Sequence, residues 1–200
     1  MCALLKRRAR YNTPMTSCTI HHTVTLTCHP DAPSQAVRRI DARIGRTPGG
    51  VLAVTYIIEA DIDRLRVPTP RAPVIAQRLW QHTCCELFIA RKDSPAYHEF
   101  NLAPSGEWAA YAFDRYRHGA ALAEEALEPQ VVVRSTREKL ELDAVIRLDR
   151  LSPTYAETGL LLTLSAVIED EHGSLSYWAL RHPPGAPDFH HPYAFALELQ

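Results

Sequence analysis

Short segments in which apolar and polar residues alternate recur along most of the chain, and this pattern constrains the fold more than any other feature. A period of two places successive side chains on opposite faces of a β-strand. Recurrence of such segments between Pro- or Gly-containing turns is typical of sandwiches, so we expect an all-β fold, a two-sheet antiparallel β-sandwich of the immunoglobulin-like or jelly-roll type with about ten or eleven strands. The expected strands span residues 19–28, 38–46, 51–60, 85–91, 97–103, 107–113, 130–136, 139–148, 161–169, 175–180 and 193–199.

The segments between these strands predict three hairpins and two longer connections. Gly adopts positive φ at low steric cost, so we expect hairpin turns at 47–50, 104–106 and 171–174. Residues 67–83 hold three prolines and then a Trp, which favours a long connection between sheets. Residues 181–192, with four prolines and three histidines, predict an irregular loop that either caps the sandwich or forms part of a site. Residues 118–129 are expected to form a pair of short helical turns.

Composition limits the classes of partner. The chain has 200 residues, 46% of them hydrophobic, which suits one domain over 16–200, preceded by a disordered arm at 1–15. Lys and Arg number 22 against 23 Asp and Glu, so no overall positive field favours nucleic acid, despite the basic run at 6–10. The sequence shows neither a signal peptide nor an apolar run long enough to cross a bilayer. We expect a soluble, cytoplasmic protein; its protein partners and oligomeric state stay open.

The cysteines and histidines give weak indications of a metal site. Cys84 and Cys85 are adjacent on an expected strand and therefore diverge, so we expect these two thiols and Cys28 to be reduced and buried. No CxxC pair is present. A weaker alternative is a metal held by His182, Asp188 and His190 in the 181–192 loop, although their spacing matches no zinc signature.

Polar residues occupy strand positions where a core would be expected. In 97–103 the alternation sends Phe100 and Leu102 to the core and Tyr97, Glu99 and Asn101 to the other face. Glu86 lies on a strand face whose other members are apolar. A carboxylate there must be paired or must border a concave site, because an isolated buried charge is too costly. Two interpretations remain open for Glu86: an ion pair with Arg115 or Arg117, or a place at the edge of a binding cleft.

Aromatic residues accompany these polar groups and favour a sugar site. Sugar rings stack their C–H faces on aromatic planes, while their hydroxyls bond to carboxylates, amides and guanidinium groups. Tyr177 and Trp178 alternate, so one of the two belongs to the core. Paired carboxylates such as Glu86 and Glu99 would need a defined separation for hydrolysis, and no G-x-S-x-G nucleophile motif is present, so we expect no enzyme activity. The candidate ligand-binding residues are Trp80, Glu86, Tyr97, Glu99, Asn101, Trp108, Arg117 and Trp178.

The central part of the chain resembles a known family. The segments CELFI, YHEFNLAPSGEW and YAFDRYR, with LW and T just upstream and the closing YWALRHPPGAPDFHHPYAFALEL, are similar to DOMON-like proteins, relatives of the family-nine carbohydrate-binding modules. The resemblance covers most of residues 79–199. It implies a β-sandwich that binds haem or sugars in a cleft. It assigns Glu86, Tyr97, Glu99, Asn101 and Trp108 to the motif of the carbohydrate-binding relatives, as ligand contacts or as residues that stabilise the hairpin.

The resemblance leaves three functions to compare. The leading one is a non-catalytic module for a carbohydrate or similar polyhydroxylated ligand, without a cofactor. The second is a haem-binding or redox-linked module: the haem-binding relatives use Met and His, and the only methionines here are Met1 and Met15, which leaves a bis-His haem through the 182–191 region. The third is a structural or protein-interaction domain without a small ligand.

Overall fold

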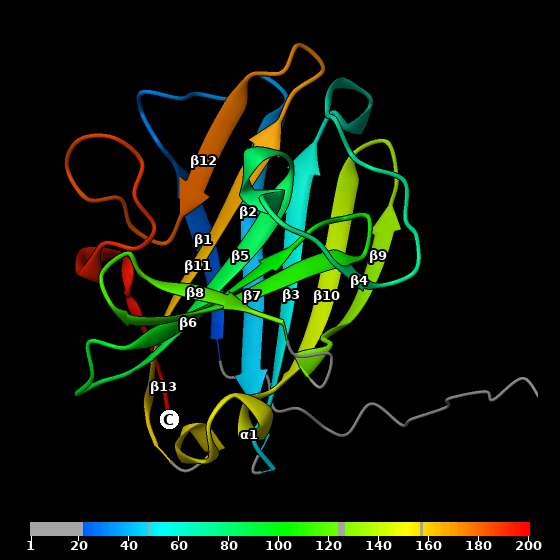
Figure 1. Cartoon of the computed structure of the whole chain (residues 1–200). Coiled ribbons are helices and arrows are strands. Elements are labelled where there is room, and N and C mark those ends of the chain that lie inside the picture. The colour runs from blue at the N-terminus through cyan, green and yellow to red at the C-terminus, as the bar shows by residue number, and fades with distance from the viewer. Residues whose placement is uncertain (1–21, 48, 124–126, 157) are drawn as a thin grey trace, which may run out of the picture.

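The computed structural model describes residues 22–47, 49–123, 127–156 and 158–200, and within them the regular structure is mainly β-strand (Figure 1). The all-β prediction is confirmed. The expected arm at 1–15 lies outside the described residues. The strands are β1 (His22–Cys28), β2 (Val37–Arg46), β3 (Val51–Ala60), β4 (Val74–Ile75), β5 (Cys84–Arg91), β6 (Tyr97–Leu102), β7 (Glu107–Arg115), β8 (His118–Leu122), β9 (Gln130–Ser135), β10 (Lys139–Arg147), β11 (Leu160–Glu169), β12 (Leu175–Ala179) and β13 (Leu197–Leu199).

The strands follow one hydrogen-bonded path that curls over on itself. Its order is β4-β7-β6-β5-β11-β12-β1-β2-β3-β10-β9, with β13 paired to β11 and β8 to β7. β1 joins the two halves of the path, because it pairs with β2 on one side and with β12 on the other. The neighbours are antiparallel except β4 and β7, which run parallel. The structure is therefore a curled mixed sheet of eleven strands along this path, and the division into two separate sheets is not confirmed.

The main core lies between the two halves of the curled sheet. It contains Ile40, Ile58 and Leu142 from the half formed by β2, β3 and β10, together with Phe100 and Leu164 from the half that contains β6 and β11. In Figure 1 the strands β5–β8 lie in front of β2, β3 and β10. Burial of these side chains is the main stabilising contribution to the fold, at roughly 25 cal/mol for each Å² of apolar surface.

The connections follow the sequence signals at the turns. Gly50, Gly106 and Gly173 all have positive φ, as the three predicted hairpin turns require. The short helices are η1 (Ile62–Arg64), η2 (Leu79–Gln81), α1 (Leu148–Leu151), η4 (Pro153–Ala156) and η5 (Pro192–Ala194).

The expected pair of helical turns at 118–129 is wrong at its start, where residues 118–122 form β8 along the edge of β7. The helical preference of the alanines in β8 is outweighed by cross-strand pairing of β8 with β7. Within the described residues no helix is long and apolar enough to cross a membrane. Cys84 and Cys85 are free and buried, whereas the free Cys28 is half-buried.

Candidate binding pocket on the outer face of the sheet

Neighbouring strands bring polar and aromatic side chains together on the face of β5–β7 that points away from the main core. Glu86 of β5 is paired with Asn101 of β6, and Phe88 with Glu99. Across the next interface Glu99 is opposite Tyr111 of β7. Directly paired residues in antiparallel strands project to the same side of the sheet. The period-two pattern of each strand therefore assembles one continuous polar and aromatic surface.

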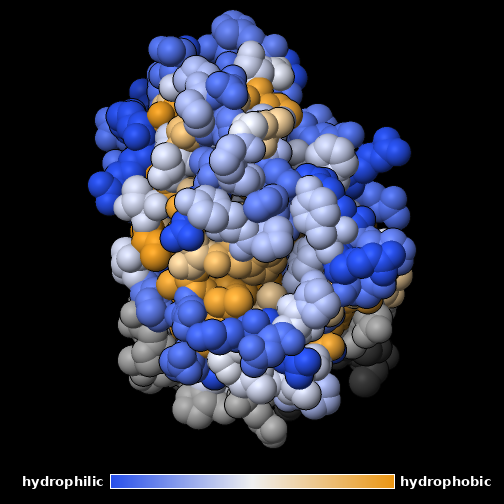
Figure 2. Space-filling model, turned by 90° about the vertical axis from the view of Figure 1, so that its left-hand side faces the viewer, coloured by the Kyte–Doolittle hydropathy of each residue, from blue (hydrophilic) through white to orange (hydrophobic). Residues whose placement is uncertain are grey.

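Two loops and one edge strand border this surface and leave an open pocket of about 560 Å³. We call it the outer-face pocket. Figure 2 views the molecule from the side on which the 181–192 loop lies in Figure 1. It shows an apolar area bordered by hydrophilic side chains. The pocket is lined by Trp80 from η2, Glu86 from β5, Glu99 from β6, Tyr111 and Phe113 from β7, Arg117 from the β7–β8 turn, Gly119, Ala120 and Ala121 from β8, Val167 from β11, Tyr177 from β12, and Pro187, Phe189 and His190 from the 181–192 loop.

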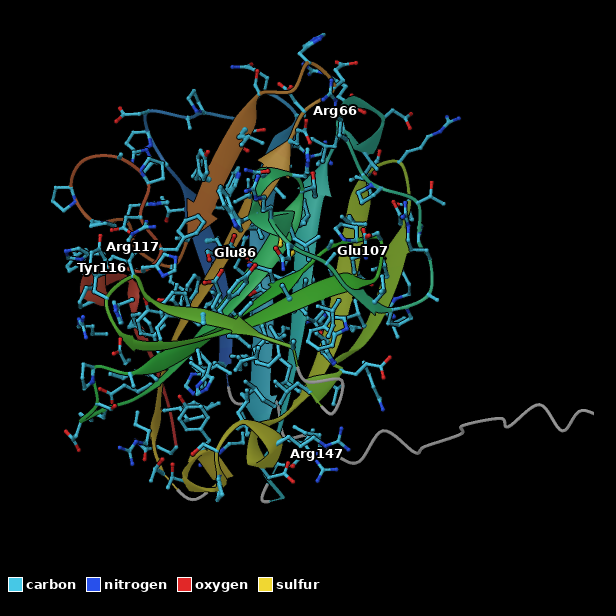
Figure 3. All side chains as sticks on the ribbon, viewed as in Figure 1. Arg66, Glu86, Glu107, Tyr116, Arg117 and Arg147 are labelled. Atoms are coloured by element: carbon cyan, nitrogen blue, oxygen red, sulfur yellow. The ribbon has the colours of Figure 1, made fainter. Side chains whose placement is uncertain are left out.

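Arg117 connects the β7–β8 turn to the 181–192 loop. Its Nη2 lies 2.7 Å from Asp188 Oδ1, and the Tyr116 hydroxyl donates to Asp188 Oδ2 at 2.7 Å. Burial alone would raise the pKa of Asp188, but these two hydrogen bonds and the guanidinium charge hold that pKa below its usual range. Figure 3 shows Tyr116 and Arg117 together at the edge of the molecule, with Glu86 further inside. Arg117 has φ of 54°, an unusual value for a bulky residue, and its guanidinium is engaged by Asp188 of the loop.

Tyr97 packs behind His190, which lines the pocket beside this connection. The Tyr97 hydroxyl accepts from the Arg117 backbone N–H at 3.1 Å and lies 2.9 Å from His190 Nδ1. We assign the hydroxyl as the donor to Nδ1, since this nitrogen is the acceptor within reach of its proton among the described residues. That assignment leaves the imidazole N–H on Nε2, which lies 3.8 Å from Glu99 Oε2. Burial, assisted by the Arg117 charge, lowers the pKa of His190 to about 4. His190 is therefore a neutral hydrogen-bond donor at neutral pH.

Glu99 and Asn101 form a buried polar pair. Asn101 Nδ2 donates to Glu99 Oε1 at 2.8 Å, and Asn101 is fully buried. Burial raises the pKa of Glu99 to about 7, although the Asn101 hydrogen bond and the Arg117 charge act in the opposite direction. Near neutral pH Glu99 can therefore act both as a donor and as an acceptor.

Glu86 is the least satisfied group in the pocket. Its residue surface is 3% exposed, yet among the described residues its carboxyl has neither a hydrogen-bond partner nor an ion-pair partner. Burial, followed by the negative field of Glu99, raises the pKa of Glu86 well above its ordinary value. The predicted ion pair with Arg115 or Arg117 is wrong, because Arg115 contacts Asp114 and Arg117 contacts Asp188. The carboxyl of Glu86 is instead available to a ligand.

The structure separates the three predicted tryptophans. Trp80 lines the pocket and is 47% exposed. Trp108 and Trp178 belong to the main core on the opposite face of their strands, so their prediction as ligand-binding residues is corrected. Trp108 is 1% exposed, and the Trp178 indole N–H donates to Ser176 Oγ. Tyr177, which alternates with Trp178, lines the pocket in its place.

The weak metal alternative does not assemble. His182 Nε2 lies 2.8 Å from the Thr27 carbonyl oxygen. His182 lines a separate cavity beside β1. Asp188 is engaged by Arg117, and His190 by Tyr97. Among the described residues no group of three or more His, Cys, Asp or Glu side chains is placed to hold a metal. The three histidines of the loop also do not converge for a bis-His haem, because only His190 lines the outer-face pocket.

Several pocket residues were missed by the sequence analysis. Tyr111 and Phe113 share the alternation of their strand and pair with Glu99 and Tyr97, so the register of the 104–106 hairpin could have found them. Phe189 was missed because it lies in an irregular loop whose path carries no periodic signal, and His190 of the same loop was named only as a metal candidate.

Comparisons with known proteins give a fold and no family assignment. No family model matches the chain, and no curated protein matches it. Among solved structures, the chain is similar to a candidate carbohydrate-binding protein from Bacteroides uniformis ATCC 8492, with a TM-score of 0.65 and 15% identity over 90% of this chain and 86% of that one. It is also similar to a family-9 carbohydrate-binding module from Caldicellulosiruptor kristjanssonii in complex with cellotriose, with a TM-score of 0.56 and 10% identity over 90% and 81% of the two chains. At these identities the likeness establishes the β-fold alone.

Proposed function

We propose that the chain is a non-catalytic binding module for a carbohydrate or a similar polyhydroxylated ligand, which it holds in the outer-face pocket. The observation that carries this proposal is the unpartnered, buried carboxyl of Glu86 in a pocket walled by aromatic side chains. The carboxyl faces the pocket, so a ligand with hydrogen-bonding groups can reach it there. The volume of about 560 Å³ falls within the range common for small-ligand sites.

The pocket offers the two kinds of contact that a sugar ring needs. Trp80, Tyr111 and Tyr177 provide aromatic planes for C–H faces, while Glu86, Glu99 and His190 Nε2 provide donors and acceptors for hydroxyls. The solved structures with this fold support the same function, since one is a candidate carbohydrate-binding protein and the other contains cellotriose.

We propose a module that binds without turnover. Support comes from the two solved structures with this fold, which are a candidate carbohydrate-binding protein and a carbohydrate-binding module in complex with cellotriose.

Two finer predictions from the sequence extend this proposal. We infer that the two halves of the curled sheet act as the layers of a β-sandwich, since they share one core. The DOMON-like relationship stays a prediction based on the motifs at 85–89, 97–108 and 111–117.

Thermal-shift measurements against a panel of mono- and oligosaccharides, both neutral and amino sugars, test the proposed function. A ligand that binds only the folded state raises its melting temperature in a saturable manner. We expect such a shift with at least one saccharide class. It should be weakened by Glu86→Ala and retained by Glu198→Gln, a change to an exposed residue that pairs with Lys92. Absence of a shift across the whole panel, including amino sugars, would refute a carbohydrate-binding role.

A further inference from the structure

The outer-face pocket has two acidic residues without a free cationic partner. Of its lining residues, Arg117 alone carries a fixed positive charge, and Asp188 already neutralises it at 2.7 Å. His190 is neutral, because burial holds its pKa near 4. The lining therefore contains two acidic side chains, Glu86 and Glu99, and no cationic side chain that is free to pair with them. A ligand group with a positive charge would complement them.

The groups around Glu86 leave its carboxyl without a cationic contact. The strands on either side of Glu86 place Asn101 and Ser165 opposite it and supply no cation, and the charge of Arg117 acts on its carboxyl through space without an ion-pair contact. Ser165, its direct partner on β11, has a buried hydroxyl without a partner among the described residues. The titratable and charged groups that act on Glu86 or share its pocket are Cys84 and Cys85 on β5, Glu99 on β6, Tyr111 on β7, Arg117 in the β7–β8 turn, Tyr177 on β12 and His190 in the loop.

We propose that the ligand carries a free amino group, as in an amino sugar, and that its ammonium binds between Glu86 and Glu99. This inference rests on the proposed function and specifies its substrate class. An ammonium has three donors and a positive charge, which suits two carboxyl groups on the neighbouring strands β5 and β6. Neutral sugar hydroxyls can also donate to these carboxyls but bring no charge to offset theirs.

The aromatic walls favour the same ligand. Ammonium groups are attracted to the faces of Trp and Tyr rings, and this attraction is stronger where water is excluded. Trp80, Tyr111 and Tyr177 approach the pocket from three different elements, η2, β7 and β12. Aromatic surface alone would suit a neutral sugar equally well, so the discriminating feature is the pair of carboxyl groups.

Binding of an ammonium is linked to proton release. In the free protein burial favours the protonated carboxyls, whereas the ammonium requires them ionised. The protons pass to the buffer on binding. The affinity for the amine therefore increases as pH rises from 5 to 7, and stops increasing where the amine itself loses its proton. A neutral sugar that bonds to the protonated carboxyls shows no such increase.

Three trisaccharides with the same β-1,4 backbone test the proposal by isothermal titration calorimetry: cellotriose, the fully deacetylated glucosamine trimer and its N-acetylated counterpart. We expect the free-amine trimer to bind at least about tenfold more tightly than either neutral trimer at pH 7, equivalent to about 1.4 kcal/mol. Its binding should also release protons when buffers of different ionisation enthalpy are compared. If the neutral trimers bind as tightly as the amine, the inference fails and the proposed function stands. If neither these trimers nor any panel saccharide binds, both fail.

Glu86→Gln separates charge from shape. The amide keeps the size and a hydrogen-bonding capacity but cannot ionise, so the preference for the free-amine trimer over the neutral trimers should fall at least about tenfold. Glu198→Gln serves as the matched control on the exposed surface. Retention of the full amine preference in both Glu86→Gln and Glu99→Gln, with each variant folded by circular dichroism, would overturn the inference.

Discussion

The two faces of β5, β6 and β7 are both buried, but they are buried by different means. The inner face places Leu87, Phe100 and Trp108 against the opposite half of the sheet, in a core of apolar side chains. The outer face carries Glu86, Glu99 and Asn101 and is covered by loops and the edge strand β8. The inner face is satisfied by packing within the chain. The outer face keeps a carboxyl without a partner in the described structure, as is expected of a surface that receives a ligand.

The difference between the two faces shows that low exposure alone does not identify a core residue. Trp108 is 1% exposed and Glu86 is 3% exposed, yet only the first is packed in the main core. Side-chain chemistry together with partner groups distinguishes the two cases. Three experiments test this comparison. One changes the inner face, and two change the outer face.

Truncation on the inner face should have the largest effect on stability. Trp108→Ala removes a fully buried indole from the core, so we expect the free energy of unfolding to fall by about 3–5 kcal/mol. Urea denaturation followed by circular dichroism measures this change. A stable Trp108→Ala variant with lost ligand binding would break the comparison, because it would assign Trp108 to the site.

The outer face should make stability depend on pH between 6.5 and 8. Burial raises the pKa of Glu99 to about 7, above its unfolded value, so its protonated form stabilises the fold and that contribution is lost as pH rises. The lowered pKa of His190 opposes this trend near pH 6.5, where the unfolded histidine still binds a proton, and the opposition fades by about pH 7.5. We expect Glu99 to lower the free energy of unfolding by on the order of 1 kcal/mol across this range, and Glu86, whose pKa burial also raises, to add to the fall.

Glu99→Gln supplies the control for the pH effect, because it removes the titrating group and keeps the side-chain shape. Thermal denaturation at pH 6.5, 7.2 and 8 should show a smaller slope for this variant. An equal slope in the variant and the unmodified protein would mean that Glu99 is not the group responsible.

Trp80→Ala should have the smallest effect on stability. Its side chain is 47% exposed in η2 at the pocket edge, so we expect the free energy of unfolding to change by less than about 0.5 kcal/mol. The affinity for a bound saccharide should nevertheless fall, since the variant removes an aromatic wall. Equal affinities of the variant and the unmodified protein in calorimetry would remove Trp80 from the site.

Much of the fold follows from local pattern. Each of the eleven expected strand segments contains a strand, because alternation and Gly turns act over a few residues. β8 was missed because Gly119 and its neighbouring alanines carry no alternation, and that strand exists through its pairing with β7. The joining of the two halves through β1 depends on contacts between distant segments, which the local pattern does not contain.

Part of the site was predictable from the sequence, because local alternation assigns each side chain to one face of its strand. Alternation correctly placed Tyr97, Glu99 and Asn101 together on the face away from the core. It was ambiguous for Trp108, because the segment 107–113 has apolar residues on both faces. The hairpin register resolves this ambiguity by pairing Trp108 with Leu102, a core residue. The position of His190 required the path of a proline-rich loop, which no periodicity describes.

The covering of the pocket by loops makes this chain a scaffold suited to directed evolution. Residues 77–82 and 181–192 close over the outer face, and neither segment contributes a buried residue to the main core. Libraries randomised at exposed positions in these two segments would vary ligand preference while the packing that holds the sheet together is unchanged. Selectivity and foldability can therefore be optimised separately in this molecule.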